Sequence, residues 1–201
     1  MRDPFLITTP TIINVSGGRT SALMLRRYLD ANGGRLPAET HAVFANVGRE
    51  RPETLDFLVR CAEAWGVDLR WIERTPGGGF REVTPETASR DGEPLATLFR
   101  ERRYLSNPVT RFCTADGKIQ TARDFMRARG YDHWTSAVGL RYDEPSRVHK
   151  LRARDAGQWD VACPLYDAKV TKGHVAEFWS RQPFDLALKS WEGNCDLCFL
   201  K

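Results

Sequence analysis

A short segment rich in serine and glycine carries the residue types that bind an anion. It follows an apolar stretch typical of a buried strand, Thr11–Val15, and precedes a segment with helical spacing, Thr20–Asn32. Glycines let backbone N–H groups converge, serine hydroxyls add donors, and a helix N-terminus adds partial positive charge. We therefore predict a loop that holds nucleotide phosphates, with a purely structural turn as the plainer alternative. The loop consists of Ser16, Gly17, Gly18, Arg19, Thr20 and Ser21.

The five cysteines are a second source of chemistry. An odd number, in a chain without a recognisable signal peptide, argues against a disulfide framework and favours catalysis, metal binding or burial. Cys195 and Cys198 form a Cys-x-x-Cys pair, which binds a metal or cycles as a dithiol. Cys113 lies between Arg111 and Lys118, near a predicted helix start, where cations lower a thiol pKa. Cys113 is therefore the natural third ligand, with plain burial as the alternative.

The charge distribution is uneven, although the net charge is only +4 from 30 basic and 26 acidic residues. Basic residues concentrate in segments 100–129 and 141–154. Solvated helix faces are one interpretation, and a cleft that binds phosphate, sulfate or a polynucleotide backbone is the other. No apolar run approaches the length of a membrane span. We therefore predict one cytoplasmic domain, residues 1–201, without a membrane partner.

Predicted strands alternate with predicted helices. This order predicts an α/β fold, doubly wound, with a mostly parallel sheet and helices on both faces, in which ligands lie beyond the carboxyl ends of the strands. A Gly/Pro-rich stretch near 74–93 predicts a mobile loop, and residues 190–201 a Cys-containing C-terminal tail. Besides the first pair, the predicted strands are 41–46, 68–73, 133–138 and 160–162, and the predicted helices are 53–65, 95–103, 115–129 and 171–181.

Four segments resemble, in order, motifs of the phosphoadenylyl-sulfate (PAPS) reductase-like family, a branch of the adenine nucleotide alpha-hydrolase (PP-loop) superfamily. The Ser-Gly-Gly-x-x-Ser loop is similar to the pyrophosphate loop of that superfamily. Residues 44–54 (FANVGRERPET) resemble Phe-x-Asp/Asn-Thr-Gly-x-x-x-x-Glu-Thr, and residues 111–118 (RFCTADGK) match Arg-x-Cys-Thr-x-x-x-Lys. Residues 138–147 (VGLRYDEPSR) resemble Gly-x-Arg-x-x-Glu-Ser-x-Arg, with Pro145 inserted before the serine.

The resemblance implies the doubly wound fold and an adenine nucleotide, ATP or PAPS, with Mg²⁺ left open. It also implies that an asparagine contacts the nucleoside and that cations neutralise the phosphate that leaves. The implied nucleotide-binding residues are Ser16, Gly17, Gly18, Arg19, Ser21, Asn46, Arg111, Lys118, Arg141 and Arg147.

The cysteine count distinguishes the branches of this family. Reductases of the iron–sulfur type bind their cluster with paired cysteines plus a later Cys-x-x-Cys, and here Phe112 replaces the first of the pair. Related thiolation enzymes hold a [4Fe-4S] cluster by three cysteines, a count that Cys113, Cys195 and Cys198 match. Zinc, held by Cys and one His, is the alternative. Cys163 is left as a fourth ligand, a reactive thiol or a buried side chain.

We therefore predict a PAPS reductase-like enzyme for Fe–S-dependent thiolation of a nucleic acid or nucleotide, with Cys113, Cys198 and Lys118 as catalytic residues. A sulfonucleotide reductase that releases sulfite is the first alternative, although its Glu-Cys-Gly-x-His segment is not found. A non-enzymatic nucleotide-binding module with structural zinc is the second. Thr20 stands where pyrophosphate-releasing members often carry aspartate, which weakens the case for pyrophosphate release. Expected partners are the nucleotide, a nucleic-acid substrate and a sulfur-donor or thiol-reductant protein, with a homodimer left open.

Overall fold

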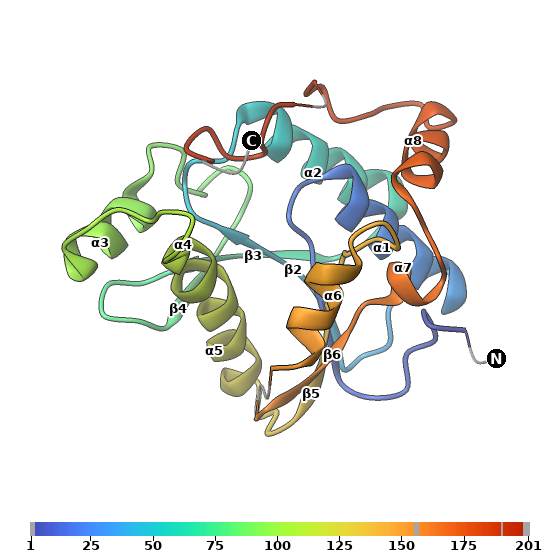
Figure 1. The fold of residues 1–201 in the computed structure, drawn as a ribbon, viewed down its shortest axis with the longest axis horizontal. Coiled ribbons are helices and arrows are strands. Elements are labelled where there is room, and N and C mark those ends of the chain that lie inside the picture. The colour runs from blue at the N-terminus through green and yellow to red at the C-terminus, as the bar shows by residue number, and fades with distance from the viewer. Residues whose placement is uncertain (1–2, 155–156, 190, 199–201) are drawn as a thin grey trace.

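The computed structural model describes residues 3–154, 157–189 and 191–198. Its strands form one six-stranded sheet in the order β4-β3-β2-β1-β5-β6 (Figure 1). All neighbouring strands are parallel except β3 and β4. Strand β1 lies between β2 and β5, and the strand order reverses at this point. The loop after β1 therefore lies at the switch point, where such sheets bind ligands. The strands are β1 (Thr11–Asn14), β2 (Thr40–Asn46), β3 (Leu69–Arg74), β4 (Phe80–Val83), β5 (Trp134–Val138) and β6 (Trp159–Ala162).

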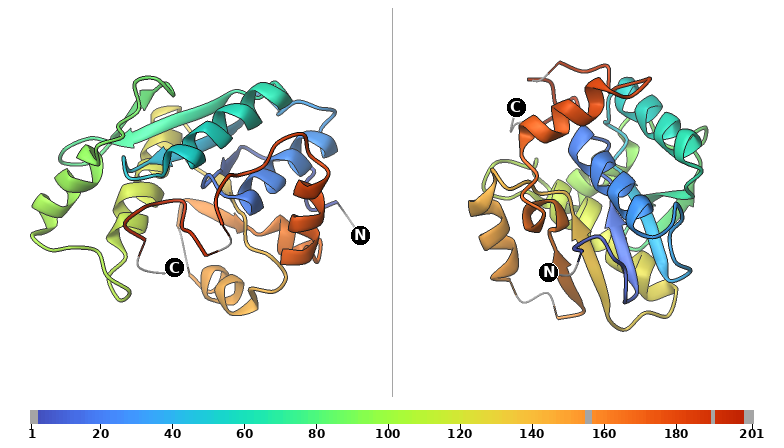
Figure 2. Two further views of the ribbon diagram at one scale, coloured as in Figure 1. Left: turned by 90° about the horizontal axis from the view of Figure 1, so that it is seen from above. Right: turned by 90° about the vertical axis from the view of Figure 1, so that its right-hand side faces the viewer.

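Helices cover both faces of the sheet (Figure 2). Successive side chains of a strand point to opposite faces, and accordingly Ile13 packs with α1 and α2, whereas Ile12 packs with α5. The helical segments are α1 (Arg19–Ala31), α2 (Pro52–Trp65), α3 (Glu93–Arg102), α4 (Phe112–Thr114), the π-helical η1 (Ala115–Gln120), α5 (Thr121–Ala128), α6 (Pro145–Arg152), α7 (Pro164–Asp167) and α8 (Lys172–Ser180).

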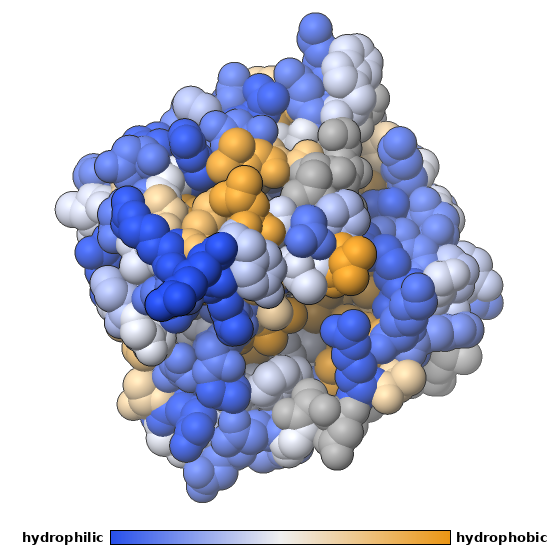
Figure 3. Space-filling model, turned by 60° about the vertical axis from the view of Figure 1, so that its left-hand side comes forward, coloured by the Kyte–Doolittle hydropathy of each residue, from blue (hydrophilic) through white to orange (hydrophobic). Residues whose placement is uncertain are grey.

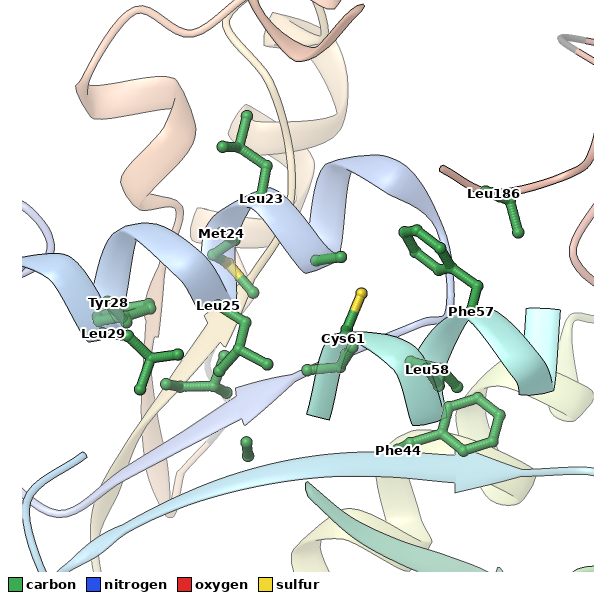
Figure 4. Packing of buried hydrophobic residues seen from close by; sticks show 14 of the residues in the cluster. Leu23, Met24, Leu25, Tyr28, Leu29, Phe44, Phe57, Leu58, Cys61 and Leu186 are labelled. Atoms are coloured by element: carbon green, nitrogen blue, oxygen red, sulfur yellow. The ribbon is translucent and has the colours of Figure 1, made fainter. Parts of the chain in front are cut away.

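The larger core lies between one face of the sheet and the helices α1, α2 and α8 (Figure 4). Met24 and Leu25 of α1 share it with Leu58 of α2 and Phe44 of β2, and all four side chains are fully buried. Burial of side chains of this size stabilises the fold by about 1.5–3 kcal/mol each. This core holds α1 against the sheet and thereby fixes the position of the loop between β1 and α1.

The opposite face carries α5 and α6. Phe125 and Met126 of α5 pack on Ile12 and Val43, and α6 packs beside β5 and β6 through Val148. Both helices run from the carboxyl ends of the strands toward their amino ends, because each precedes the next strand of a parallel sheet. The space between the two helices leaves part of the sheet uncovered.

The predicted fold class is confirmed, and three elements were missed. The stretch 74–93 contains β4, a short edge strand whose alternation is obscured by charged residues. Residues 145–147, interpreted as the end of a loop motif, begin α6, because Pro145 occupies the first helical turn, where proline is favoured. Helix α7 was not predicted either. None of the described helices is both long and apolar enough to cross a membrane.

Candidate functional site

The predicted phosphate loop lies at the carboxyl end of β1. Gly17 adopts a φ of +79°, and α1 begins at Arg19 with Gly18 as its N-cap. The Ser21 hydroxyl accepts a hydrogen bond from the Ser16 N–H at 3.0 Å and donates to the Gly18 carbonyl oxygen at 3.0 Å. The first turn of α1 holds no acidic residue, and no described side chain caps it. The helix N-terminus therefore keeps its partial positive charge and N–H groups for an anion.

Arg141, which we predicted to bind phosphate, lies directly beside this loop. Its Nη1 donates to the Thr20 hydroxyl at 3.2 Å and lies 3.3 Å from a Glu144 carboxylate oxygen. Gly139 permits this approach, because a Cβ at that position would lie 3.2 Å from the Cα of Ser21. The Nε of Arg141 also pairs with Asp143 at 3.0 Å, so two acidic partners hold Arg141 in place while it contacts the loop.

The Arg19 guanidinium is directed elsewhere. It pairs with Asp185 at 2.7 Å and donates to the backbone carbonyls of Leu186 and Leu188. These contacts anchor segment 185–188 to the start of α1. A contribution of Arg19 to anion binding would therefore come from its backbone N–H and not from its guanidinium.

Asn46, predicted to contact the nucleoside, is fully buried in an internal network. Its amide donates to Glu73 at 2.7 Å and to the Ser89 carbonyl at 2.9 Å, and its oxygen accepts from the Gly48 N–H at 3.0 Å. All hydrogen-bonding groups of its side chain thus have protein partners. Asn46 shapes the turn after β2, and a direct contact with a nucleoside stays a prediction.

Lys118 forms an ion pair with a buried carboxylate near the loop. Its Nζ lies 2.9 Å from Glu50 Oε1, and the Glu50 side chain is completely buried. Burial lowers the pKa of Lys118, but Glu50 and then the thiols of Cys195 and Cys113 raise it, and the net pKa is raised. Lys118 therefore stays cationic, with both thiols within electrostatic reach of its ammonium group.

The C-terminal tail is fastened to the phosphate loop by Asn194. Its side-chain amide donates to the Ser16 carbonyl oxygen at 3.1 Å, and its own carbonyl accepts from the Arg51 N–H at 2.8 Å and the Thr54 hydroxyl at 3.3 Å. The contact with the loop is close, since a Cβ on Gly18 would lie 2.9 Å from the Asn194 amide nitrogen. The tail thus lies over both the loop and the start of α2.

The Cys-x-x-Cys pair follows Asn194 directly. Cys195 pairs with Glu50 in an antiparallel bridge, and the Asp196 N–H donates to the Arg49 carbonyl at 2.9 Å. A turn closes when the Cys198 N–H donates to the Cys195 carbonyl at 3.3 Å. Burial raises the pKa of Cys195 to about 11. Of the predicted tail 190–201, residue 190 and residues 199–201 lie outside the described residues.

The three predicted metal ligands do not form a ready ligand set. Within the described ranges, no group of three or more His, Cys, Asp or Glu side chains is arranged to hold a metal ion. Cys113, Cys195 and Cys198 are half-buried, whereas Cys163 is buried beneath α6 with Val148. Binding of one metal centre by all three half-buried thiols therefore requires the tail or the start of α4 to shift.

Thiol labelling of the metal-free protein tests which cysteines are buried and which are half-buried. Cys61 and Cys163 should resist an aromatic disulfide reagent in the native protein, because both are buried and burial raises both pKa values, that of Cys61 to about 12. At pH 8 such a pKa leaves about one thiol in ten thousand as the reactive thiolate. All five cysteines should react after denaturation. Labelling of Cys61 at the rate of Cys113 in the native protein would contradict the described burial.

Comparisons with known proteins place the fold. No protein-family model matches the chain. The chain is 26% identical over 199 residues to the "Uncharacterized nin region protein ORF290" of Escherichia phage lambda. The match covers 94% of this chain and 66% of that protein. Among solved structures it is similar to the U34-tRNA thiolase NcsA from Methanococcus maripaludis with its [4Fe-4S] cluster, at a TM-score of 0.50 and 16% identity. That match covers 90% of this chain and 59% of the thiolase chain. The likeness shows that the two share an α/β fold.

Three functional candidates were missed from the sequence. Glu50 partners Lys118, Glu73 organises the turn after β2, and Asn194 ties the tail to the loop. Glu50 lies inside the segment that resembles a family motif, but at one of its variable positions. Asn194 adjoins the cysteine pair, which is the only signal that could have drawn attention to it. Their partners lie too far away in the sequence to be inferred from local pattern.

Proposed function

We propose that the chain is a PP-loop enzyme of sulfur transfer that binds an adenine nucleotide at the Ser16–Ser21 loop and thiolates a nucleic acid or nucleotide. The observation that carries this proposal is the Asn194 contact, which ties the Cys195–Cys198 turn to the phosphate loop. The loop that we propose to bind the nucleotide and a pair of cysteines thereby lie together at the switch point of the sheet. The shared fold with a tRNA thiolase is consistent with this assignment.

The nucleotide phosphates would be held by backbone N–H groups at the start of α1 and by nearby cations. Arg141 already contacts the loop, and Arg111, Lys118 and Arg147 line the cleft that begins at Ser16. Cations and oriented N–H groups stabilise the charge that develops on a leaving phosphate, which is the main task in phosphoryl chemistry. ATP and PAPS both carry the phosphates that this arrangement suits.

The reaction we propose for ATP has two steps. A carbonyl oxygen of the acceptor base attacks the α-phosphorus, so that an O–P bond forms and pyrophosphate leaves. A sulfur nucleophile at the oxidation level of sulfide then attacks the carbon of the base that carries this oxygen, and the C–O bond breaks to release AMP. Sulfur enters as sulfide and leaves as a thiocarbonyl, so no net oxidation occurs. Lys118 and Arg141 would neutralise the phosphates in both steps.

We also propose that Cys113, Cys195 and Cys198 bind an iron–sulfur cluster in the complete enzyme. The support comes from the chemistry of the three half-buried thiols and from the ammonium group of Lys118, which interacts electrostatically with Cys195 and Cys113. Because the described thiols are not gathered into a ligand set, no reaction step is assigned to the cluster.

Anaerobic purification tests this proposal. We expect visible absorbance with iron and acid-labile sulfide in the native protein, and loss of all three in Cys198→Ala, while ATP binding measured by calorimetry is spared because the phosphate loop is intact. Cys61→Ala is the matched control, since it removes a buried thiol far from the tail turn in the core of Figure 4. Iron should remain in that variant.

Other outcomes would overturn parts of the proposal. Intact absorbance in Cys198→Ala would exclude this cysteine as a ligand. Stoichiometric zinc in a colourless protein without turnover would favour a binding module with a structural metal. Sulfite release from PAPS with a thiol reductant would favour a sulfonucleotide reductase. Absence of ATP and PAPS binding would overturn the assignment of the loop.

A further inference from the structure

A cleft of about 610 Å³ opens between α5 and α6, and the sheet forms its floor. The floor is built from side chains of β1, β2, β5 and β6 that point to this face, and most of them are apolar, among them Ile12, Val43 and Val161. Figure 3 shows the hollow, with hydrophobic surface inside it and hydrophilic residues around it. Of the phosphate loop only Ser16 lines the cleft, at one end and next to Val15.

All charged side chains that line this cleft are positive. Six of its lining residues are cations and none is an acid, although the whole chain has nearly as many acidic as basic residues. Lys118, Arg123 and Arg147 have carboxylate partners. Arg111, Lys150 and Arg154 pair with no acid in the described part of the chain. The six lining cations are Arg111, Lys118, Arg123, Arg147, Lys150 and Arg154.

The cations extend along the cleft and are not gathered at the phosphate loop. Because α6 runs toward the amino ends of the strands, Arg147 lies at the loop end, and Lys150 and then Arg154 lie progressively farther away. Arg147 and Lys150 are three residues apart and therefore lie on one side of α6, and Arg154 follows in the turn after the helix ends at Arg152. On the opposite side of the cleft, Lys118 and Arg123 follow the same direction.

An aromatic pair closes the far end of the cleft. Trp134 and Trp159, the first residues of β5 and β6, stack with ring centroids 5.6 Å apart and an interplanar angle of 21°. Trp159 is only half-buried. At about 3.3 Å per residue, Trp134 lies roughly 13 Å from Val138 at the loop end of the same strand. The tryptophan end of the cleft therefore lies away from the phosphate loop.

We infer that the far end of the cleft, lined by Arg123, Lys150, Arg154 and Trp159, is a second subsite that binds the backbone of a single-stranded nucleic acid. The inference rests on the proposed function, since this strand would carry the base that accepts sulfur. Two rows of cations match a phosphodiester chain, and an apolar floor with a half-buried tryptophan suits unstacked bases. Acidic peptides offer the charge but lack flat apolar bases to cover that floor.

The test measures binding of short, fluorescently labelled single-stranded RNA and DNA by anisotropy. Lys150→Ala/Arg154→Ala should weaken binding about tenfold and lower the slope of log K against log salt by about 1.4, since each phosphate contact on a single strand contributes about 0.7. The slope is taken between about 50 and 200 mM salt. The RNA and DNA arms show which backbone the subsite accepts.

Lys172→Ala/Arg181→Ala is the matched control. It removes the same charge from exposed positions at the two ends of α8, a helix that packs against α1 on the other side of the sheet. This variant should bind both strands as the native protein does. An equal loss in both variants would show that only overall charge matters, and equal affinity for polyglutamate would show that bases are not recognised. Either result would overturn the inference.

ATP binding separates this inference from the proposed function. Lys150→Ala/Arg154→Ala should bind ATP within about twofold of the native protein, because both residues lie away from the phosphate loop. One outcome is that neither the native protein nor any variant binds ATP or PAPS, whereas binding of the single strand still depends on Lys150 and Arg154. In that case the proposed function is wrong and the inferred subsite is confirmed. If ATP binds but neither strand does, the subsite fails alone.

Discussion

Replacing Gly17 with alanine is expected to abolish nucleotide binding and to destabilise the protein by about 2–5 kcal/mol. Gly17 has a φ of +79°, which costs an L-residue about 1–2 kcal/mol. A Cβ there would also lie 2.3 Å from Thr54 Cγ2, and overpacking of a buried site costs about 1–3 kcal/mol. Thr54 is fully buried and bonds Asn194, so the strain spreads to both α2 and the tail. Urea unfolding and ATP calorimetry measure the two effects.

Gly18→Ala is the matched control for this experiment. Gly18 has an ordinary φ of −97°, and an added Cβ would meet only the Asn194 side chain, at 2.9 Å. Because that side chain can move away, the expected loss of stability is below about 1 kcal/mol. If both variants lose stability and ATP affinity equally, the rigid contact between Gly17 and α2 is not what holds the loop.

Replacing Glu73 with alanine should produce the second large effect, a loss of about 2–6 kcal/mol, because two buried donors would each lose an acceptor at a cost of about 1–3 kcal/mol. The Glu73 carboxylate is completely buried and accepts four hydrogen bonds. Two come from Arg81 at 2.7 and 3.0 Å, one from Asn46 at 2.7 Å and one from the Ser89 N–H at 2.6 Å. Removal of the carboxylate leaves the Asn46 amide and the Ser89 N–H without their acceptor, and these unpaired donors account for most of the lost free energy of unfolding. Chemical denaturation of the purified variant gives the magnitude.

Glu82→Ala provides the comparison, since Glu82 is the same residue type on the neighbouring strand β4. It pairs with Arg70 at 3.5 Å and Arg129 at 2.8 Å, but its side chain is 41% exposed. Exposed pairs contribute little, so this variant should lose no more than about 1 kcal/mol. Equal losses in Glu73→Ala and Glu82→Ala would contradict the described network around Asn46.

Several parts of the site could be predicted because their signals are local. The loop between β1 and α1 follows from an apolar strand, two glycines and a helical pattern that lie next to each other. The alternation of strands and helices likewise predicts a parallel sheet, and therefore the edge at which the motifs after β1, β2 and β5 meet. Arg141 is found beside the loop for this reason.

Other parts depended on contacts between distant segments. The motif predicts that Arg19 binds phosphate, yet its guanidinium donates a hydrogen bond to Asp185, which lies far along the chain. Asn46 looks like a nucleoside contact, yet Glu73 on the next strand takes its amide. In each case a polar group near the predicted site finds a protein partner, because an unpaired buried group costs free energy.

The sequence by itself determined the fold class, the position of the Ser16–Ser21 loop and the residue types available for chemistry there. These features depend on hydrophobic period and turn residues, which act over a few neighbouring positions. Only the tertiary structure decided which of these residues are free and which are used internally, and that the cysteine tail lies over the loop through Asn194. It also decided that cations from two separate helical segments line one cleft. Such placements follow from packing and from the pairing of buried polar groups across the whole chain, and no local pattern records them.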